Sequence, residues 1–188
     1  MKNKKNYIQT YSGVIFYPLE PDPDLILLPD IAHALSNQCR FGGHVRKFHS
    51  VAQHCVQVAN LLKLNSPEIQ LAGLLHDATE AYLVDLPKPI KNKMPIYVEA
   101  EERLLKSIAV RFNISFDLFK EVKEADRSAL AIESLHLMVP LHADFELTKR
   151  DIENVSGLSL GVCWTPEKAE KMYLEKFSEI WFKRLEHS

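Results

Sequence analysis

Helix-start signals recur along this chain, and they constrain its fold more than any other feature. Ser50 stands three residues before Gln53, and Ser66 directly precedes Pro67, so each serine can cap a helix that begins just after it. Apolar side chains then recur at helical spacing, most clearly after Thr165. The apolar positions of that stretch are Ala169, Met172, Tyr173, Phe177, Ile180 and Trp181. These patterns predict a mostly α fold.

The predicted helices cover most of the chain. They span approximately residues 29–35, 51–62, 67–80, 95–112, 116–139 and 165–185. Residues 7–17 are instead rich in β-branched and aromatic side chains and are interrupted by Ser12-Gly13, which predicts a small N-terminal hairpin. No linker or internal repeat divides the sequence. We therefore expect a single domain over residues 1–188, with the hairpin as an appendage.

Composition narrows the classes of partner. The chain carries 23 Lys and Arg against 25 Asp and Glu, so its formal net charge of -2 provides no broad positive field for binding a nucleic-acid duplex. Its three cysteines are widely spaced, which favours neither a disulfide framework nor a zinc knuckle and is typical of a reducing cytoplasm. No apolar stretch approaches the ~18 residues of a membrane span, and the N-terminus lacks the apolar core of a secretion signal.

The pair His76-Asp77, followed by Glu80, is the main chemical feature of the sequence. Adjacent residues of an α-helix lie ~100° apart, so His76 and Asp77 flank a common direction, and Glu80 shares a face with His76. An imidazole and a carboxylate side by side can bind one metal ion, and a further carboxylate can handle its water. The pattern favours a hydrolytic metal site, although a His-Asp pair alone is common.

Two ligands would hold a divalent ion weakly, so further ligands are expected from other helices. His54 lies within one predicted helix among mainly apolar neighbours, and Asp126 lies in the middle of another. Taken alone, His54 is more typical of a buried core histidine. Asp126 could instead be a solvent-facing carboxylate paired with Arg127 or Lys123.

Four stretches, taken together, resemble the HD phosphohydrolase superfamily and especially its bacterial 5′-deoxynucleotidases. They are residues 51–59 around His54, 74–80 with the His76-Asp77 pair, 85–91, and 123–126. Arg40-Phe41 is similar to an arginine–aromatic pair of that branch, and the resemblance runs in order from about residue 31 to 135. The segments 10–13, 30–35 and 39–43 are also similar to the phage dATP triphosphohydrolases.

This resemblance implies a role for each motif residue. The implied metal ligands are His54, His76, Asp77 and Asp126. Glu80 would act on the attacking water, Asp85 would bind the sugar or metal-bound water, and Arg40 would orient the phosphate. The metal would neutralise the phosphoryl oxygens and lower the pKa of its water. Two histidines and two aspartates suit zinc, cobalt, manganese, nickel or iron, so the identity of the ion stays open.

The implied substrate is a small deoxynucleotide. Its pocket would be lined by Phe41, Asp85, Leu86, Pro87 and Lys88. Where the nucleotidases carry a tryptophan after the arginine, this chain has Phe41, which keeps a stacking surface but lacks the indole N–H donor. The resemblance also implies a homo-oligomer, either a dimer or a larger ring.

Two groups of basic side chains have alternative interpretations. His44, Arg46 and Lys47 could bind a polyphosphate, or they could form a solvated basic loop. For Lys88 the sequence favours neither interpretation, a pocket residue or a solvated loop residue. Lys91 and Lys93 are more typical of a solvated loop.

These observations lead to one main functional hypothesis and several alternatives. We expect a metal-dependent hydrolase of deoxynucleotide 5′-phosphate esters, in the first place a dATP-type triphosphohydrolase that releases triphosphate. The alternative is a 5′-deoxynucleotidase that releases orthophosphate from deoxynucleoside monophosphates. A di-iron HD oxygenase and a non-catalytic nucleotide sensor are more distant alternatives, and Glu80 with Asp85 argues against the sensor because a binder needs no water-activating carboxylate.

Overall fold

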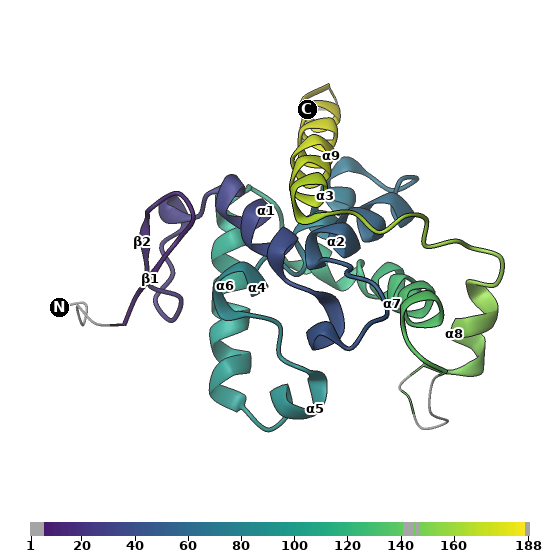
Figure 1. Cartoon of the computed structure of the whole chain (residues 1–188). Coiled ribbons are helices and arrows are strands. Elements are labelled where there is room, and N and C mark those ends of the chain that lie inside the picture. Colours follow the sequence, from purple (N-terminus) through teal and green to yellow (C-terminus); the bar gives the residue numbers. More distant parts are fainter. Residues whose placement is uncertain (1–5, 141–144, 146, 187–188) are drawn as a thin grey trace.

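The computed structural model of the protein describes residues 6–140, 145 and 147–186. It is mostly helical, with a two-stranded antiparallel sheet near the N-terminus (Figure 1). The helices are α1 (Leu28–Asn37), α2 (Val51–Leu61), α3 (Pro67–Leu75), α4 (Glu80–Leu83), α5 (Lys88–Lys91), α6 (Pro95–Arg111), α7 (Lys123–Leu137), α8 (Lys149–Asn154) and α9 (Pro166–Glu186). Short 3₁₀ helices are η1 (Pro23–Leu25), η2 (Arg40–Gly43) and η3 (Phe116–Lys120). The prediction of a mostly α fold with an N-terminal hairpin is confirmed, while the single domain stays a prediction.

Ring contacts and a hydrogen bond join the hairpin to the helical body, and the Tyr11 ring of its turn stacks on His33 of α1 with centroids 3.7 Å apart. Strands β1 (Ile8–Gln9) and β2 (Ile15–Phe16) pair Ile8 with Phe16 and Gln9 with Ile15. Gly13 closes the turn with φ +81°, a conformation that glycine adopts without strain. The Phe16 ring is buried 4.3 Å from the Tyr82 ring of α4. The N–H of Ser12 donates to the Asp30 carboxylate of α1 at 2.6 Å.

The main core lies where α9 packs against α1, α2 and α3, and Figure 1 shows α9 standing over the latter two. Tyr173 is completely buried there, and its hydroxyl donates to the Leu74 carbonyl at 2.9 Å. The rings of Phe177 and Trp181 stack with centroids 5.5 Å apart and pack on the same core. The aromatic stripe of the C-terminal helix is therefore a core feature.

Helix α3 ends earlier than the sequence pattern predicts. It stops at Leu75, and residues 76–79 form turns before α4 begins. In a regular helix the Gly73 carbonyl would accept from the N–H of residue 77. Here the His76 ring takes that carbonyl instead, with Nδ1 2.8 Å from the oxygen. The Glu80 N–H then donates to the Asp77 carbonyl at 3.0 Å, an i to i+3 bond that tightens the turn.

The predicted helix 116–139 is divided in two. The short η3 covers its beginning, and α7 starts only at Lys123, so Asp126 lies in the first turn of a helix rather than in the middle of one. A carboxylate in that position is favoured by the helix dipole. The sequence pattern does not predict helix α8, because that helix is short and polar. Thr148 and Asp151 form a reciprocal capping box at its start.

None of the helices in the described part of the chain is long and apolar enough to cross a bilayer. The cysteines Cys39, Cys55 and Cys163 are all free thiols. This agrees with the absence of a cysteine pairing pattern in the sequence.

Candidate metal centre

His54 comes from α2, whose start is fixed by the predicted serine cap. The Ser50 hydroxyl accepts from the Gln53 N–H at 3.1 Å. The Gln53 side chain does not complete a capping box, because it binds the backbone of Val162 and Trp164 instead. The cap places His54 in the first turn of α2, where its side chain is completely buried.

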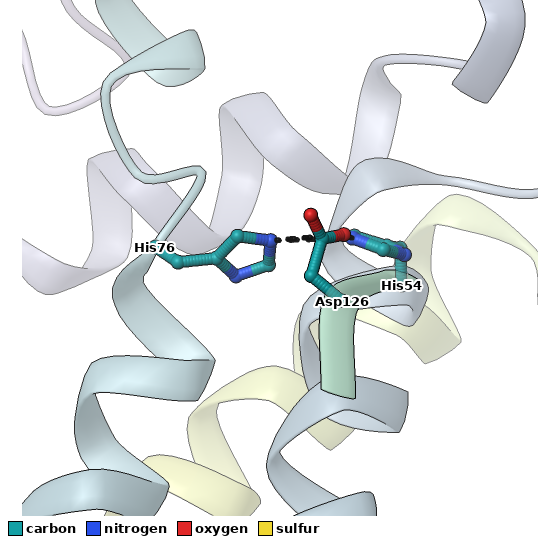
Figure 2. Close-up of side chains that lie close together, drawn as sticks. All are labelled: His54, His76 and Asp126. Atoms are coloured by element: carbon teal, nitrogen blue, oxygen red, sulfur yellow. Dashed lines mark hydrogen bonds and ion pairs between the residues drawn. The ribbon is translucent and has the colours of Figure 1, made fainter. Parts of the chain in front are cut away.

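His76 and Asp77 lie on the turn that follows α3, and Asp126 lies in the first turn of α7. Their side chains are 12%, 20% and 43% exposed, in that order, whereas His54 has no exposed surface. Figure 2 shows the His54 and His76 rings facing each other with the Asp126 carboxylate between them, each carried by a different segment of the chain. The cluster is thus closed on the His54 side and open on the Asp126 side, where water or a substrate could enter.

Four donor atoms converge in this cluster. Nε2 of His54 lies 3.3 Å from Nε2 of His76, 3.5 Å from Oδ2 of Asp77 and 3.1 Å from Oδ1 of Asp126. Nε2 of His76 lies 3.3 Å from the same Asp77 oxygen and 3.7 Å from the Asp126 oxygen. Metal–ligand bonds of 2.0–2.2 Å at angles between octahedral and tetrahedral place neighbouring donors about 3–3.6 Å apart. The spacing therefore fits a single metal ion.

The histidine tautomers also suit a metal. Nδ1 of His54 bonds to Oε1 of Glu133 at 2.6 Å, and Nδ1 of His76 bonds to the Gly73 carbonyl. Both acceptors require Nδ1 to carry the proton, which leaves a lone pair on each Nε2. The two Nε2 lone pairs and the two carboxylates then point at one another, an arrangement that a cation stabilises and that water alone would not.

The charge balance favours a divalent ion. Arg40 interacts with the carboxylates of Glu133, Asp77 and Asp126, and this single cation leaves two of their three negative charges in excess. Buried charge without compensation is costly. Burial opposes ionisation of Asp77, yet His76, His54 and Arg40 lower its pKa to about 2.

Without a metal ion, protons take its place on the two imidazoles. Burial alone would lower the pKa of His76, but Asp77 and Asp126 raise that pKa well above its usual value. The pKa of His54 is also raised. Burial and the charge of Arg40 lower it, but the combined effect of Glu133 and Asp126 is larger. Protons and a metal ion must therefore compete for the same nitrogens.

Glu80 lies beside this cluster and keeps one oxygen free. The residue is only 7% exposed, and Oε2 has no hydrogen-bond partner among the described residues. Burial and the nearby charges of Asp77 and Asp85 raise the pKa of Glu80 well above its usual value. Asp85 is half-buried, and its own pKa is raised mainly by burial, with Arg40 acting in the opposite direction. The structure thus brings both carboxylates within electrostatic reach of the ligands.

Arg40 reaches the same cluster from η2. Its Nη1 lies 3.7 Å from Oδ2 of Asp77, and its Nε lies 3.3 Å from Oε2 of Glu133. The Phe41 ring lies 5.4 Å from the guanidinium carbon, close enough for a cation–π contact. Phe41 has φ +56° and Gly42 has φ +59°, so the backbone turns sharply just after the arginine.

The other predicted site residues lie on two segments, 86–88 and 44–47, that differ in exposure. Leu86 is half-buried, while Pro87 and Lys88 are exposed. His44, Arg46 and Lys47 are also exposed, and no contact among the described residues joins their side chains to the donor atoms. The backbone N–H of Arg46 donates to the Leu137 carbonyl, which holds this loop against the end of α7. Both interpretations of this loop, a polyphosphate site and a solvated basic loop, stay predictions.

Sequence reasoning missed Glu133 and His49, both completely buried. Oε1 of Glu133 bonds to His54 and lies 3.4 Å from Nε2 of His49. The available signal was weak: Glu133 stands seven residues after Asp126 and therefore on the same helical face. A buried glutamate on that face is informative only once its neighbours on α2 are known.

Cys55 offers a second set of donors with His76 and Asp77, whose ligand atoms all lie within 4.8 Å of one another. Burial raises the pKa of the Cys55 thiol to about 11, although His76 acts in the opposite direction. The thiolate is the metal-binding form of cysteine, so a protonated, buried thiol is a poor ligand. The histidine–aspartate set is the better metal site.

Cavity size does not identify this site. One cavity of about 290 Å³ lies between the hairpin, α1 and α4, and another of about 290 Å³ lies along α2 beside residues 158–164. Neither is lined by any of the four donor residues. The chemistry of the converging atoms is the stronger evidence.

Similarity to known proteins covers nearly the whole chain, although no family model matches it. The chain is 41% identical to YfdR of Escherichia coli, an uncharacterized protein, over 93% of this chain and 96% of that protein. An uncharacterized protein of Rhodobacter capsulatus is 32% identical over 87% of this chain and 90% of that protein. A 5′-deoxynucleotidase of Vibrio atlanticus is a distant relative, 29% identical over 55% of this chain and 70% of that protein.

Proposed function

We propose that this chain, which belongs to the same family as the Escherichia coli protein YfdR, is a metal-dependent HD phosphohydrolase that cleaves the 5′-phosphate ester of 2′-deoxynucleotides. The observation that carries the proposal is the convergence of two imidazole nitrogens and two carboxylate oxygens, 3.1–3.7 Å apart over five of their pairs. The distant similarity to a 5′-deoxynucleotidase supports a phosphate ester as substrate.

Each residue of the site then has a task. The two histidines and two aspartates, His54, His76, Asp77 and Asp126, hold the divalent metal. When bound, such an ion supplies charge neutralisation and a water of lowered pKa. Arg40 orients the phosphate through the guanidinium nitrogen that its two carboxylate contacts leave free. Phe41 forms a wall beside that arginine.

Glu80 handles the proton of the attacking water. Its unpartnered Oε2 can accept a hydrogen bond from water, and a carboxyl group whose pKa is raised well above its usual value is suited to take up and return a proton. Asp85 lies close enough to interact electrostatically with Glu80, and it would bind the sugar or a second water. Removing these groups should lower turnover more than metal binding.

The number of phosphates removed is the finer part of the proposal. The relative with a described activity is a 5′-deoxynucleotidase, which favours orthophosphate release from monophosphates. The triphosphohydrolase interpretation needs extra cations, and the exposed side chains of His44, Arg46 and Lys47 make no contact with the ligands among the described residues. We therefore rank the monophosphate substrate first. Triphosphate release and a homo-oligomer stay predictions.

The test is product analysis on metal-loaded protein. Panels of deoxynucleoside monophosphates, deoxynucleoside triphosphates and ribonucleotides would be assayed with Co²⁺, Mn²⁺, Ni²⁺, Zn²⁺ and Fe²⁺ in turn. Orthophosphate from a monophosphate supports the nucleotidase, and tripolyphosphate from a triphosphate supports the alternative. A protein that binds deoxynucleotides but hydrolyses none would be a sensor, and oxygen consumption without hydrolysis would indicate an oxygenase.

Substitutions separate the proton-handling role from the metal-binding role. Glu80→Gln should lower kcat by roughly 10²–10⁴-fold and leave the bound metal in place, because it removes a proton acceptor and not a ligand. Asp77→Ala should remove both metal and turnover. Glu124→Gln is the matched control, since Glu124 is exposed on α7. Unchanged turnover in Glu80→Gln would contradict the mechanism.

A further inference from the structure

We infer that Glu133 is a positioning residue that couples the metal ligand His54 to the phosphate-orienting Arg40 through a single buried carboxylate. The inference rests on the proposed function, because it takes Arg40 as the residue that binds the phosphate. It assigns to Glu133 a task that neither the sequence motifs nor the metal ligands include.

The two oxygens of Glu133 serve different partners. Oε1 bonds to Nδ1 of His54 at 2.6 Å, and Oε2 lies 3.3 Å from Nε of Arg40. The glutamate has no exposed surface and the Arg40 side chain is only 11% exposed, so water cannot replace these bonds. One rigid carboxylate therefore fixes the distance between a metal ligand and a substrate-binding cation.

The His54 contact controls which ring nitrogen faces the metal. A carboxylate accepts hydrogen bonds and donates none, so it holds the proton of His54 on Nδ1 and leaves Nε2 free for the ion. Partners of this kind fix the tautomer and orientation of a metal-binding histidine, and their loss typically weakens metal binding by roughly 10–100-fold.

The Arg40 contact leaves part of the guanidinium available. Its Nε faces Glu133, and its Nη1 lies 3.7 Å from Asp77. Within the described part of the chain, Nη2 makes no hydrogen bond or ion pair. Because the fork is planar and rigid, fixing Nε also fixes the direction of Nη2. Glu133 thus sets the direction of Nη2, and Asp77, a predicted metal ligand, contacts the same arginine.

An amide in place of the carboxylate could satisfy only one partner. If the amide oxygen introduced by Glu133→Gln faced His54, the new NH₂ would meet the N–H of Arg40, donor against donor. If the amide were turned, its NH₂ would face Nδ1 of His54 and favour the tautomer with the proton on Nε2, which leaves no lone pair there for the ion. This asymmetry makes Glu133→Gln a sharp probe of the coupling.

His49 completes the surroundings of Glu133. Its Nε2 lies 3.4 Å from Oε1, an ion-pair distance at which the angles give no regular hydrogen bond. The ring is completely buried and fills the space beside the carboxylate. This packing limits the freedom of Glu133 to rotate away from His54.

The experiment measures two affinities without turnover. Co²⁺ binding is followed by absorbance with a competing chelator, and inorganic phosphate binding to the Co²⁺-saturated protein is followed by calorimetry. In Glu133→Gln we expect at least one large loss: Co²⁺ binding weaker by roughly 10–100-fold, or phosphate binding weaker by a similar factor at saturating Co²⁺. Arg40→Lys should weaken phosphate binding and leave Co²⁺ binding within about twofold.

A double-mutant cycle tests the coupling itself. If Glu133 acts on phosphate through Arg40, the phosphate losses of Glu133→Gln and Arg40→Lys will be less than additive in the double variant. If Glu133→Gln weakens phosphate binding and this loss simply adds to that of Arg40→Lys, or if Glu133→Gln keeps both affinities at the wild-type level, the inference is overturned. The Glu124→Gln protein is the control on the same helix.

A second variant and the choice of binding measurements keep this test independent of folding and of turnover. Should Glu133→Gln fail to fold, Glu133→Asp keeps the charge but shortens the reach, so it should still lose one of the two affinities. Both affinities are defined even if the wild-type protein hydrolyses no deoxynucleotide. Failure of the proposed function and failure of this inference would therefore give different results.

Discussion

Helix α7 carries two charged clusters that look alike in distance and differ in their surroundings. Glu133 holds His54 with a bond of 2.6 Å inside the protein, where neither side chain has exposed surface. Arg127 holds Asp151 of α8 with a bond that is also 2.6 Å, but the arginine is 40% exposed. Bond length therefore does not rank the two clusters. Access of water distinguishes the two clusters, because solvent can replace a lost partner only in the exposed Arg127–Asp151 pair.

The largest expected effect of this difference is on folding stability. Glu133→Ala removes the partner of two buried groups, His54 and Arg40, and should lower the free energy of unfolding by about 3–5 kcal/mol. Urea unfolding in the presence of EDTA measures this, so that a lost metal does not contribute. Glu124→Ala should change stability by less than about 0.5 kcal/mol. Equal effects of the two substitutions would show that the buried contacts of Glu133 add no stability beyond that of an exposed glutamate on the same helix.

The next effect is the pH dependence of metal binding. The pKa values of His54 and His76 are raised, so protons occupy these rings at a higher pH than they would occupy a free imidazole. Co²⁺ affinity should consequently fall as the pH is lowered through neutrality, by up to about tenfold per pH unit for each proton displaced. Absorbance titrations across neutral pH would check this, and a flat profile would contradict the raised pKa values.

The smallest effect concerns the exposed cluster. Hydrogen bonds from Arg127 and Thr148 hold the pKa of Asp151 well below its usual range. The folded-state pKa is depressed, so any stabilisation is fully present above the unfolded value of about 3.9 and is lost as the pH falls toward the folded value. Asp151→Asn should lower the urea midpoint slightly at neutral pH and by progressively less as the pH falls below about 4. A loss as large as that of Glu133→Ala would show that exposure does not weaken this pair.

The sequence predicts those parts of the fold and site that depend on local chemistry. Serine caps and apolar periodicity locate α2, α3 and α9, and the His76-Asp77 pair points to the metal cluster. These signals work because a cap or a helical face involves neighbours only a few residues apart. The pattern predicts His76 inside a helix, and the structure places it just after one, with its ring bonded to the Gly73 carbonyl.

Contacts between distant segments are not predictable in the same way. Glu133 meets His54 across 79 positions of sequence, and only its place on the helical face of Asp126 distinguishes it from an exposed glutamate such as Glu124. Helix α8 escapes prediction because it is short and polar, and its start is marked by a capping box of Thr148 and Asp151 without a following apolar periodicity. The basic side chains of His44, Arg46 and Lys47 are exposed, and their predicted contact with a polyphosphate stays a prediction, because charge alone does not show what a loop binds.

The break in the helix at His76 has a mechanical consequence. His76 is fastened to α3 through the Gly73 carbonyl, whereas Asp77 is fastened to α4 through the N–H of Glu80. A single ion bound by both residues would therefore link the end of α3 to the start of α4. Loss of the ion would remove this link, so the angle between α3 and α4 could change, and the position of Glu80 would change with it. Metal loss and misplacement of the proton acceptor would then be one event and not two.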